Sequence, residues 1–142
     1  MRALSVPWAK GAAGRPLLAE FSRSPTAAHS LRWSIGNAIE VLADDTLGEN
    51  ILRIVSDATN GAARQMFVLS LGKIRHPDSV PTLMALLADE EVVGHAAEAL
   101  GRLRALEAVP LLEALSHRAT AKPWVRKAAV KALTRIQKSQ IK

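Results

Sequence analysis

One segment of the chain is repeated soon after its first appearance. Residues 66–81 read MFVLSLGKIRHPDSVP, and residues 95–110 read HAAEALGRLRALEAVP. With residue 95 placed on residue 66, five positions coincide without a gap: Leu71, Gly72, Arg75, Val80 and Pro81 meet Leu100, Gly101, Arg104, Val109 and Pro110. A unit of this length cannot bury its own apolar face, so a chain that repeats it builds a core by stacking successive copies.

Each copy has the pattern of two helices joined by a turn. Residues 93–103 (VGHAAEALGRL) place Ala96, Ala99, Leu100 and Leu103 at helical spacings of three and four. A second helix begins near residue 108 (AVPLLEAL), with Pro110 in its first turn, where a missing N–H costs nothing. No segment alternates between apolar and polar residues over a useful length. We therefore expect an all-α fold.

The same frame extends in both directions with more drift. VRKAAVKALTRI (125–136) matches the first helix again, and LRWSIGNAIEVL (31–42) followed by ENILRIV (49–55) supplies another pair. Upstream, residues 3–5 resemble the end of a first helix and residues 14–21 its second helix. The sequence thus predicts a single domain, 1–142, with repeats at approximately 1–26, 27–60, 61–89, 90–120 and 121–142, the last partial.

Composition limits the class of protein. The 142 residues are 49% hydrophobic, enough for a continuous core, and the absence of Cys excludes disulfides and Cys-held metals. No apolar run approaches the roughly 20 residues that cross a bilayer, and the first residues lack the apolar middle of a signal peptide. We expect a cytoplasmic protein that does not interact with a membrane.

The repeated pattern resembles HEAT repeats, especially the short variety found in phycobilisome lyases. The likeness rests on Arg64 with Leu71-Gly72, on Ala96-Ala97 with Ala99-Leu100-Gly101, and on Val125-Arg126 with Ala132-Leu133. It covers nearly all of the chain, although Ser5 and Thr134 replace the Gly in the outer copies. The resemblance implies a right-handed α-solenoid of helical hairpins.

The start of the chain does not fit a complete repeat. Met1 falls inside what should be a first helix, although terminal repeats of a solenoid normally form a polar cap. We hypothesise that the chain is a fragment of a longer array.

No motif in the sequence points to catalysis. GHAAEALG (94–101) is similar to the iron-binding helices of deoxyhypusine hydroxylases, but Ala96 follows His95 where the carboxylate ligand should stand. Asp44-Asp45 and Asp89-Glu90-Glu91 lie where one helix ends and the next begins, so we interpret them as helix-capping acids. We expect no enzyme activity, no metal and no cofactor.

Charge is distributed unevenly along the chain. Residues 37–113 carry six basic and twelve acidic side chains, whereas residues 114–142 carry eight basic and no acidic ones. The final helix has an apolar stripe, so its cations suit a solvated cap, an acidic protein partner or a phosphate backbone. The candidate basic patch consists of Arg118, Lys122, Arg126, Lys127, Lys131 and Arg135.

The function predicted from these features is a non-enzymatic scaffold or adaptor that binds another protein. The resemblance implies that partners dock on a concave surface formed by the second helices. Aligned positions on the non-core side of those helices give the candidate binding residues Glu20, Asn50, Arg53, Asp57, Thr82 and Leu111. The alternatives are a nucleic-acid-binding module that uses the basic C-terminal helix and, third, a lyase-like accessory subunit of a modifying enzyme.

The alignment gives two registers for the helix around residue 33. With Gly36 placed on Gly72 and Gly101, Trp33 is exposed and Arg32 takes the buried position of Val68. A shift of one residue buries Trp33 instead. Because a buried, unpaired guanidinium is costly, we favour the shifted register and expect Trp33 to pack between repeats.

Overall fold

The computed structural model describes residues 7–23 and 29–140, which form an all-α solenoid without strands. The eight α-helices of this part are α1 (Pro7–Arg23), α2 (His29–Leu42), α3 (Gly48–Ser56), α4 (Gln65–Ser70), α5 (Ser79–Leu86), α6 (Val93–Arg102), α7 (Val109–Ser116) and α8 (Pro123–Gln140). Short 3₁₀ turns connect them: η2 (Asp45–Leu47), η3 (Ala58–Arg64), η4 (Leu71–Lys73) and η5 (Leu106–Ala108).

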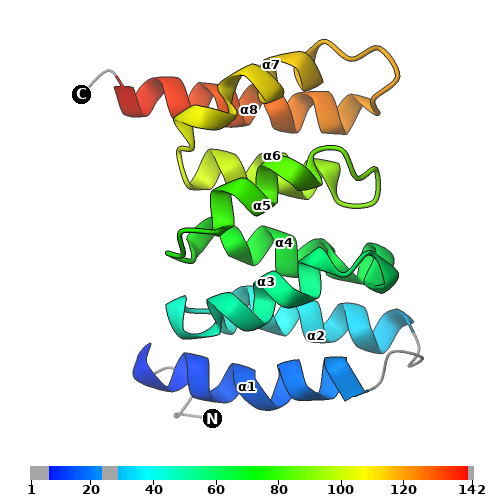
Figure 1. The fold of residues 1–142 in the computed structure, drawn as a ribbon, viewed down its shortest axis with the longest axis vertical. Helices are drawn as coiled ribbons and strands as arrows, with labels where there is room; N and C mark the ends of the chain where they lie inside the picture. The colour runs from blue at the N-terminus through cyan, green and yellow to red at the C-terminus, as the bar shows by residue number, and fades with distance from the viewer. Residues whose placement is uncertain (1–6, 24–28, 141–142) are drawn as a thin grey trace.

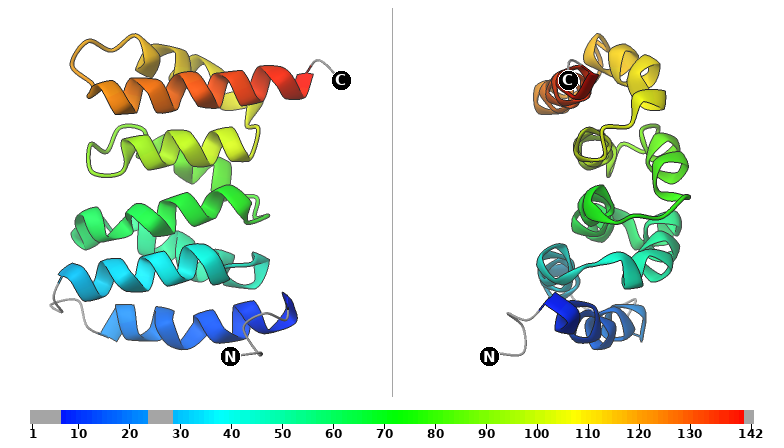
Figure 2. Two further views of the ribbon diagram at one scale, coloured as in Figure 1. Left: turned by 180° about the vertical axis from the view of Figure 1, so that it is seen from behind. Right: turned by 90° about the vertical axis from the view of Figure 1, so that its left-hand side faces the viewer.

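The helices form two layers (Figure 1). Helices α2, α4, α6 and α8 stack as the first helices of successive hairpins, and α3, α5 and α7 form the second layer (Figure 2). Helix α1 covers one end of the stack, where Phe21 meets Phe67 of α4 edge to face at a ring distance of 4.6 Å. The predicted helix at 14–21 is therefore part of a longer helix, and residues 3–5 lie outside the described residues.

Small residues hold the first helices close together. A methyl group on Gly101 would lie 2.8 Å from Cα of Ala132, and one on Gly72 would lie 3.0 Å from Cα of Ala99. The first helices accordingly contact one another more extensively than the second helices do.

The acidic clusters cap turns as expected. The Asp44 carboxylate accepts a hydrogen bond of 3.0 Å from the backbone N–H of Thr46, at the start of η2. Asp89 accepts one of 3.0 Å from the backbone N–H of Glu91. In both cases the short acidic side chain satisfies a backbone donor that the turn leaves without a partner.

Arg64 connects two consecutive hairpins from a fully buried position. Its guanidinium donates to the carbonyls of Gly61 at 2.8 Å and Val55 at 3.1 Å, and it pairs with Asp89 at 2.8 Å. Burial alone raises the pKa of Asp89, but the hydrogen bonds from Arg64 and from Glu91, together with the Arg64 charge, lower it below its ordinary value.

Arg126 lies at the matching position of the last repeat and also donates hydrogen bonds to backbone carbonyls. Its Nη1 donates to the carbonyls of Arg118 at 3.3 Å, Ala119 at 3.2 Å and Ala121 at 2.6 Å. The arginine of the repeat pattern is therefore a structural residue that fixes the loop in front of a first helix.

The prediction for Trp33 was wrong, because the unshifted register holds. Trp33 is 39% exposed and Arg32 is only 7% exposed, while Gly36 packs against Met66 and Phe67 as its counterparts pack against the following repeats. The burial of Arg32 is tolerated because its guanidinium lies 3.9 Å from the ring centre of Phe21 and donates to Asn60.

The two buried arginines should differ in their contribution to stability. Arg64→Met leaves two carbonyls and a carboxylate without their donor, so we expect the free energy of unfolding to fall by about 3 kcal/mol. Arg32→Met exchanges a buried cation without an ion pair for an apolar chain of similar length, so we expect a change below about 1 kcal/mol. Urea denaturation measures both, and equal losses would contradict this assignment.

The glycines of the first helices should also differ. Gly101→Ala places a methyl group against the backbone of Ala132, so we expect a loss of about 2 kcal/mol on urea denaturation. Gly36→Ala meets only the side chains of Met66 and Phe67, the nearest atom at 3.2 Å. There the gain in helix propensity, about 1 kcal/mol, should offset the crowding. A neutral Gly101→Ala variant would disprove the close helix contact.

Candidate binding surfaces

A polar cavity of about 430 Å³ lies among α1, α2, α3 and η3. We call it the arginine cavity. It is lined by Arg15, Leu18, Ala19, Phe21, Ser22, Arg32, Asn50, Arg53, Ile54, Asp57, Thr59 and Asn60. Three guanidinium groups and a single carboxylate thus line one hollow, which makes its surface electropositive.

Arg32 is the buried cation of the arginine cavity. Its Nη2 donates to Oδ1 of Asn60 at 2.9 Å, and the amide of Asn60 is itself fixed by donation to the carbonyl of Ile54 at 3.0 Å. The Nε of Arg32 is buried and has no hydrogen-bond acceptor among the described residues. The guanidinium is therefore held in place with donor capacity left over.

Asp57 stands at the edge of the same cavity. Its Oδ1 accepts from the hydroxyl of Thr59 at 2.6 Å and from the backbone N–H of Thr59 at 3.0 Å. These two hydrogen bonds, followed by the charges of Arg64 and Arg32, hold the pKa of Asp57 below its ordinary value against a small effect of burial. The carboxylate stays ionised, but no ion pair joins it to Arg32 among the described residues.

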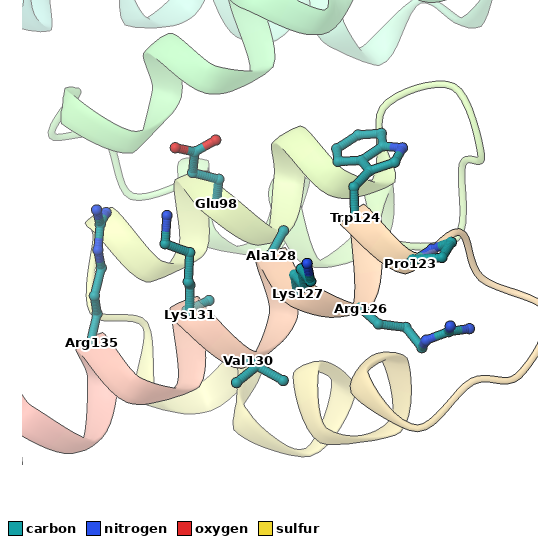
Figure 3. Close-up of a pocket in the computed structure, with 10 residues that line it drawn as sticks. Glu98, Pro123, Trp124, Arg126, Lys127, Ala128, Val130, Lys131 and Arg135 are labelled. Atoms are coloured by element: carbon teal, nitrogen blue, oxygen red, sulfur yellow. The ribbon is translucent and has the colours of Figure 1, made fainter.

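A second hollow, of about 710 Å³, runs along α8 and faces α6. We call it the tryptophan groove. Its lining consists of Glu98, Pro123, Trp124, Arg126, Lys127, Ala128, Val130, Lys131, Ala132 and Arg135. Figure 3 shows Trp124, Lys131 and Arg135 projecting from α8 on the side of Glu98, while Arg126 and Val130 project elsewhere.

Trp124 is exposed and yet firmly held. Its side chain is 50% exposed, but its six-membered ring lies on the backbone of Gly94, where an added methyl group would come within 2.1 Å of the ring. The ring also meets His95 edge to face, at 5.7 Å between centres. Only a glycine at position 94 leaves room for this arrangement.

His95 is partly buried beneath Trp124. Its Nδ1 is buried without a hydrogen-bond partner among the described residues. Burial lowers the pKa of His95, and the nearby carboxylate of Glu98 opposes this shift without reversing it. His95 therefore packs as a neutral ring.

The structure divides the predicted basic patch. Lys127, Lys131 and Arg135 line the tryptophan groove at successive turns of α8. Arg126 also borders the groove, but its guanidinium holds backbone carbonyls. Arg118 lies 4.0 Å from Glu90, and Lys122 is exposed before α8 begins.

The six residues predicted on the second helices are dispersed. Asn50, Arg53 and Asp57 line the arginine cavity, and Thr82 lines a more open hollow of about 730 Å³ beside the Arg64–Asp89 pair. Leu111 is exposed on α7, and Glu20 is half-buried on α1 and lines none of these hollows.

Sequence reasoning missed Arg15, Arg32 and Trp124 as surface-forming residues. The available signal for Trp124 was its place after Pro123 at the start of a helix, together with a glycine rather than a larger residue at position 94.

Residues 7–23 and 29–140 contain no group of three or more His, Cys, Asp or Glu side chains arranged to hold a metal ion. None of the helices in these ranges is long and apolar enough to span a bilayer.

The state of His95 should make stability depend on pH. Because its pKa is lower in the folded than in the unfolded chain, stability is fully present above about pH 6.5, the ordinary value, and is lost as the pH falls below it through the lower pKa of the folded chain. Urea denaturation at pH 7.5 and 5.5 should show a smaller loss for His95→Gln than for wild type. His117→Gln, at an exposed position, is the control and should keep the wild-type loss.

Comparison with known families identifies the central hairpins. Residues 63–89 and 92–117 match the PBS lyase HEAT-like repeat, and these two segments contain the α4–α5 and α6–α7 hairpins. No curated protein and no solved structure shows a significant match to the chain. Two adjacent PBS lyase HEAT-like repeats therefore form the centre of the helical array.

Proposed function

We propose that this protein is a non-enzymatic scaffold or adaptor that binds another protein through the surface of its helical array. Arrays of this kind present a long, rigid surface, and each repeat contributes side chains at fixed spacing. The observation that carries the proposal is Trp124, a large aromatic side chain that is half exposed in a groove and held there by Gly94 and His95.

An immobilised, exposed tryptophan suits a protein contact. Tryptophan is enriched among the few residues that carry most of the binding free energy at protein interfaces. Because the ring of Trp124 is already packed on one face, little conformational entropy is lost when a partner covers the other face. Ala128 and Pro123 extend the apolar floor of the groove on either side of the ring.

The charges around the groove favour an acidic partner. Lys127, Lys131 and Arg135 lie one helical turn apart and form a row of cations about 12 Å long. Residues 114–142 contain no acidic side chain, so this end of the chain attracts anionic surfaces. An acidic segment with one large apolar side chain would place that side chain on Trp124 and its carboxylates along the row.

Nucleic acid is the second candidate, because an exposed aromatic ring beside a row of cations is also found in single-strand-binding surfaces. One feature favours protein instead. Trp124 is the one aromatic ring in the lining of the groove, whereas single-strand-binding surfaces stack successive bases on several rings. An accessory role beside a modifying enzyme, as the name of the matched repeat suggests, would use the same kind of protein docking.

Trp124→Ala should disrupt partner binding while Trp33→Ala does not. Both residues are exposed tryptophans on first helices, so Trp33→Ala is a matched control. Cross-linked capture from the source cell, after nuclease treatment, should recover a protein with wild type and Trp33→Ala. Once the partner is purified, its affinity for Trp124→Ala should be about 30-fold weaker, and Lys131→Glu should slow its association.

The same measurements separate the alternatives. Equal capture by wild type and Trp124→Ala would contradict docking at the groove. Submicromolar binding of a single-stranded oligonucleotide at physiological salt, with a steep salt dependence, would favour the nucleic-acid candidate.

A further inference from the structure

We infer that the arginine cavity binds an oxyanion, namely the phosphate or carboxylate group of a ligand. This site lies among α1, α2 and α3, at the opposite end of the array from the tryptophan groove between α6 and α8 (Figure 1). It is therefore independent of the proposed docking surface, and either site could be lost without the other.

The inference starts from the incomplete pairing of Arg32. Its side chain is more than nine-tenths buried, yet among the described residues only Asn60 accepts a hydrogen bond from it and its Nε has no acceptor. Arg64, which is buried to a similar degree, is matched by two carbonyls and a carboxylate. A buried guanidinium with spare donors is costly unless an acceptor completes it.

Packing alone does not require a cation at this position. Arg32 occupies the place that Val68 and Ala97 fill in the following repeats, and both of those residues are buried apolar side chains. An apolar residue would serve the contact between repeats at lower cost. The presence of arginine at this position is explained if its guanidinium binds an anionic ligand.

The rest of the cavity supports an anion. Arg15 and Arg53 add two exposed guanidinium groups at the opening, and no salt bridge occupies either of them among the described residues. The only carboxylate in the lining is Asp57, whose Oδ1 already accepts two hydrogen bonds from Thr59. The net charge of the lining is therefore positive.

The donor geometry specifies an oxyanion rather than a halide. Guanidinium groups present paired N–H donors that match two oxygens of a phosphate or carboxylate. Asn50, at the rim of the cavity, can donate one further hydrogen bond from its amide. A volume of about 430 Å³ admits a small molecule or the acidic end of a larger one.

Titration with inorganic phosphate and, separately, with sodium acetate tests the inference at constant ionic strength maintained with sodium chloride. The arginine Nε–H signals of the full chain are followed by NMR, and the Arg32 signal is assigned from Arg32→Met. We expect a saturable shift of the Arg32 signal with an apparent Kd on the order of 1 mM. Stronger binding of phosphate assigns the site to phosphate groups, and stronger binding of acetate assigns it to carboxylates.

Two variants and one control make the test specific. Arg53→Met removes an exposed cation of the cavity without altering the buried core and should weaken binding about tenfold. Arg32→Met should abolish the saturable response to both anions. Arg75→Met, an exposed arginine outside the lining, should bind as wild type does. No saturable shift in wild type, or equal shifts in wild type and Arg53→Met, would overturn the inference.

Discussion

The close approach of consecutive first helices is the constraint on which the rest of this structure depends. At Gly72 and Gly101 the next helix lies so near that an added methyl group would meet its backbone at 3.0 and 2.8 Å. Each such contact fixes the rotation of one first helix against the next, because only the side of the helix that carries the glycine can lie so close to the neighbouring backbone. Once that rotation is set, the residue four positions earlier faces the core, as Arg32, Val68 and Ala97 all do. The burial of Arg32 therefore follows from the place of Gly36.

The same constraint explains why the two buried arginines differ. Arg64 precedes its first helix, where the loop offers carbonyls and the next hairpin offers Asp89, so the local structure supplies all its partners. Arg32 lies within a helix whose backbone groups are already bonded to one another, and in the described part of the chain its guanidinium stacks on Phe21 and donates to one amide oxygen. The packing of Gly36 therefore places the Arg32 guanidinium in the core, where it stacks on Phe21 and forms no ion pair among the described residues. Its incomplete pairing is a consequence of register and not of poor packing.

The sequence predicts the helices but not the binding surfaces, because helix signals are local and the surfaces depend on contacts between distant segments. Periodicity and Pro110 predict α6 and α7 because these signals are local. The register of α2 depends on weighing a buried Arg32 against a buried Trp33, and the sequence does not reveal that Phe21 lies within reach of Arg32. The turn after α6 places Arg104 at φ 52° without a glycine, stabilised by hydrogen bonds that return to Gly101 and Leu100. The packing of Trp124 on Gly94 joins residues of different repeats, so no pattern of neighbouring residues predicts this contact.

An array of this kind separates structural from binding roles by position. Most contacts in this solenoid join neighbouring repeats, although the Glu40–Arg102 pair joins α2 directly to α6. A substitution in α1 or α2 therefore mainly changes the energetics of that end and reaches α8 only through the intervening helices. The arginine cavity and the tryptophan groove can therefore carry features that are costly for stability, a buried cation in one and an exposed aromatic ring in the other. The central hairpins contain the fully paired Arg64 and the two glycines, Gly72 and Gly101, that meet the backbone of the next first helix. These hairpins lie between the two surfaces in the stack and join them through packed first helices (Figure 1).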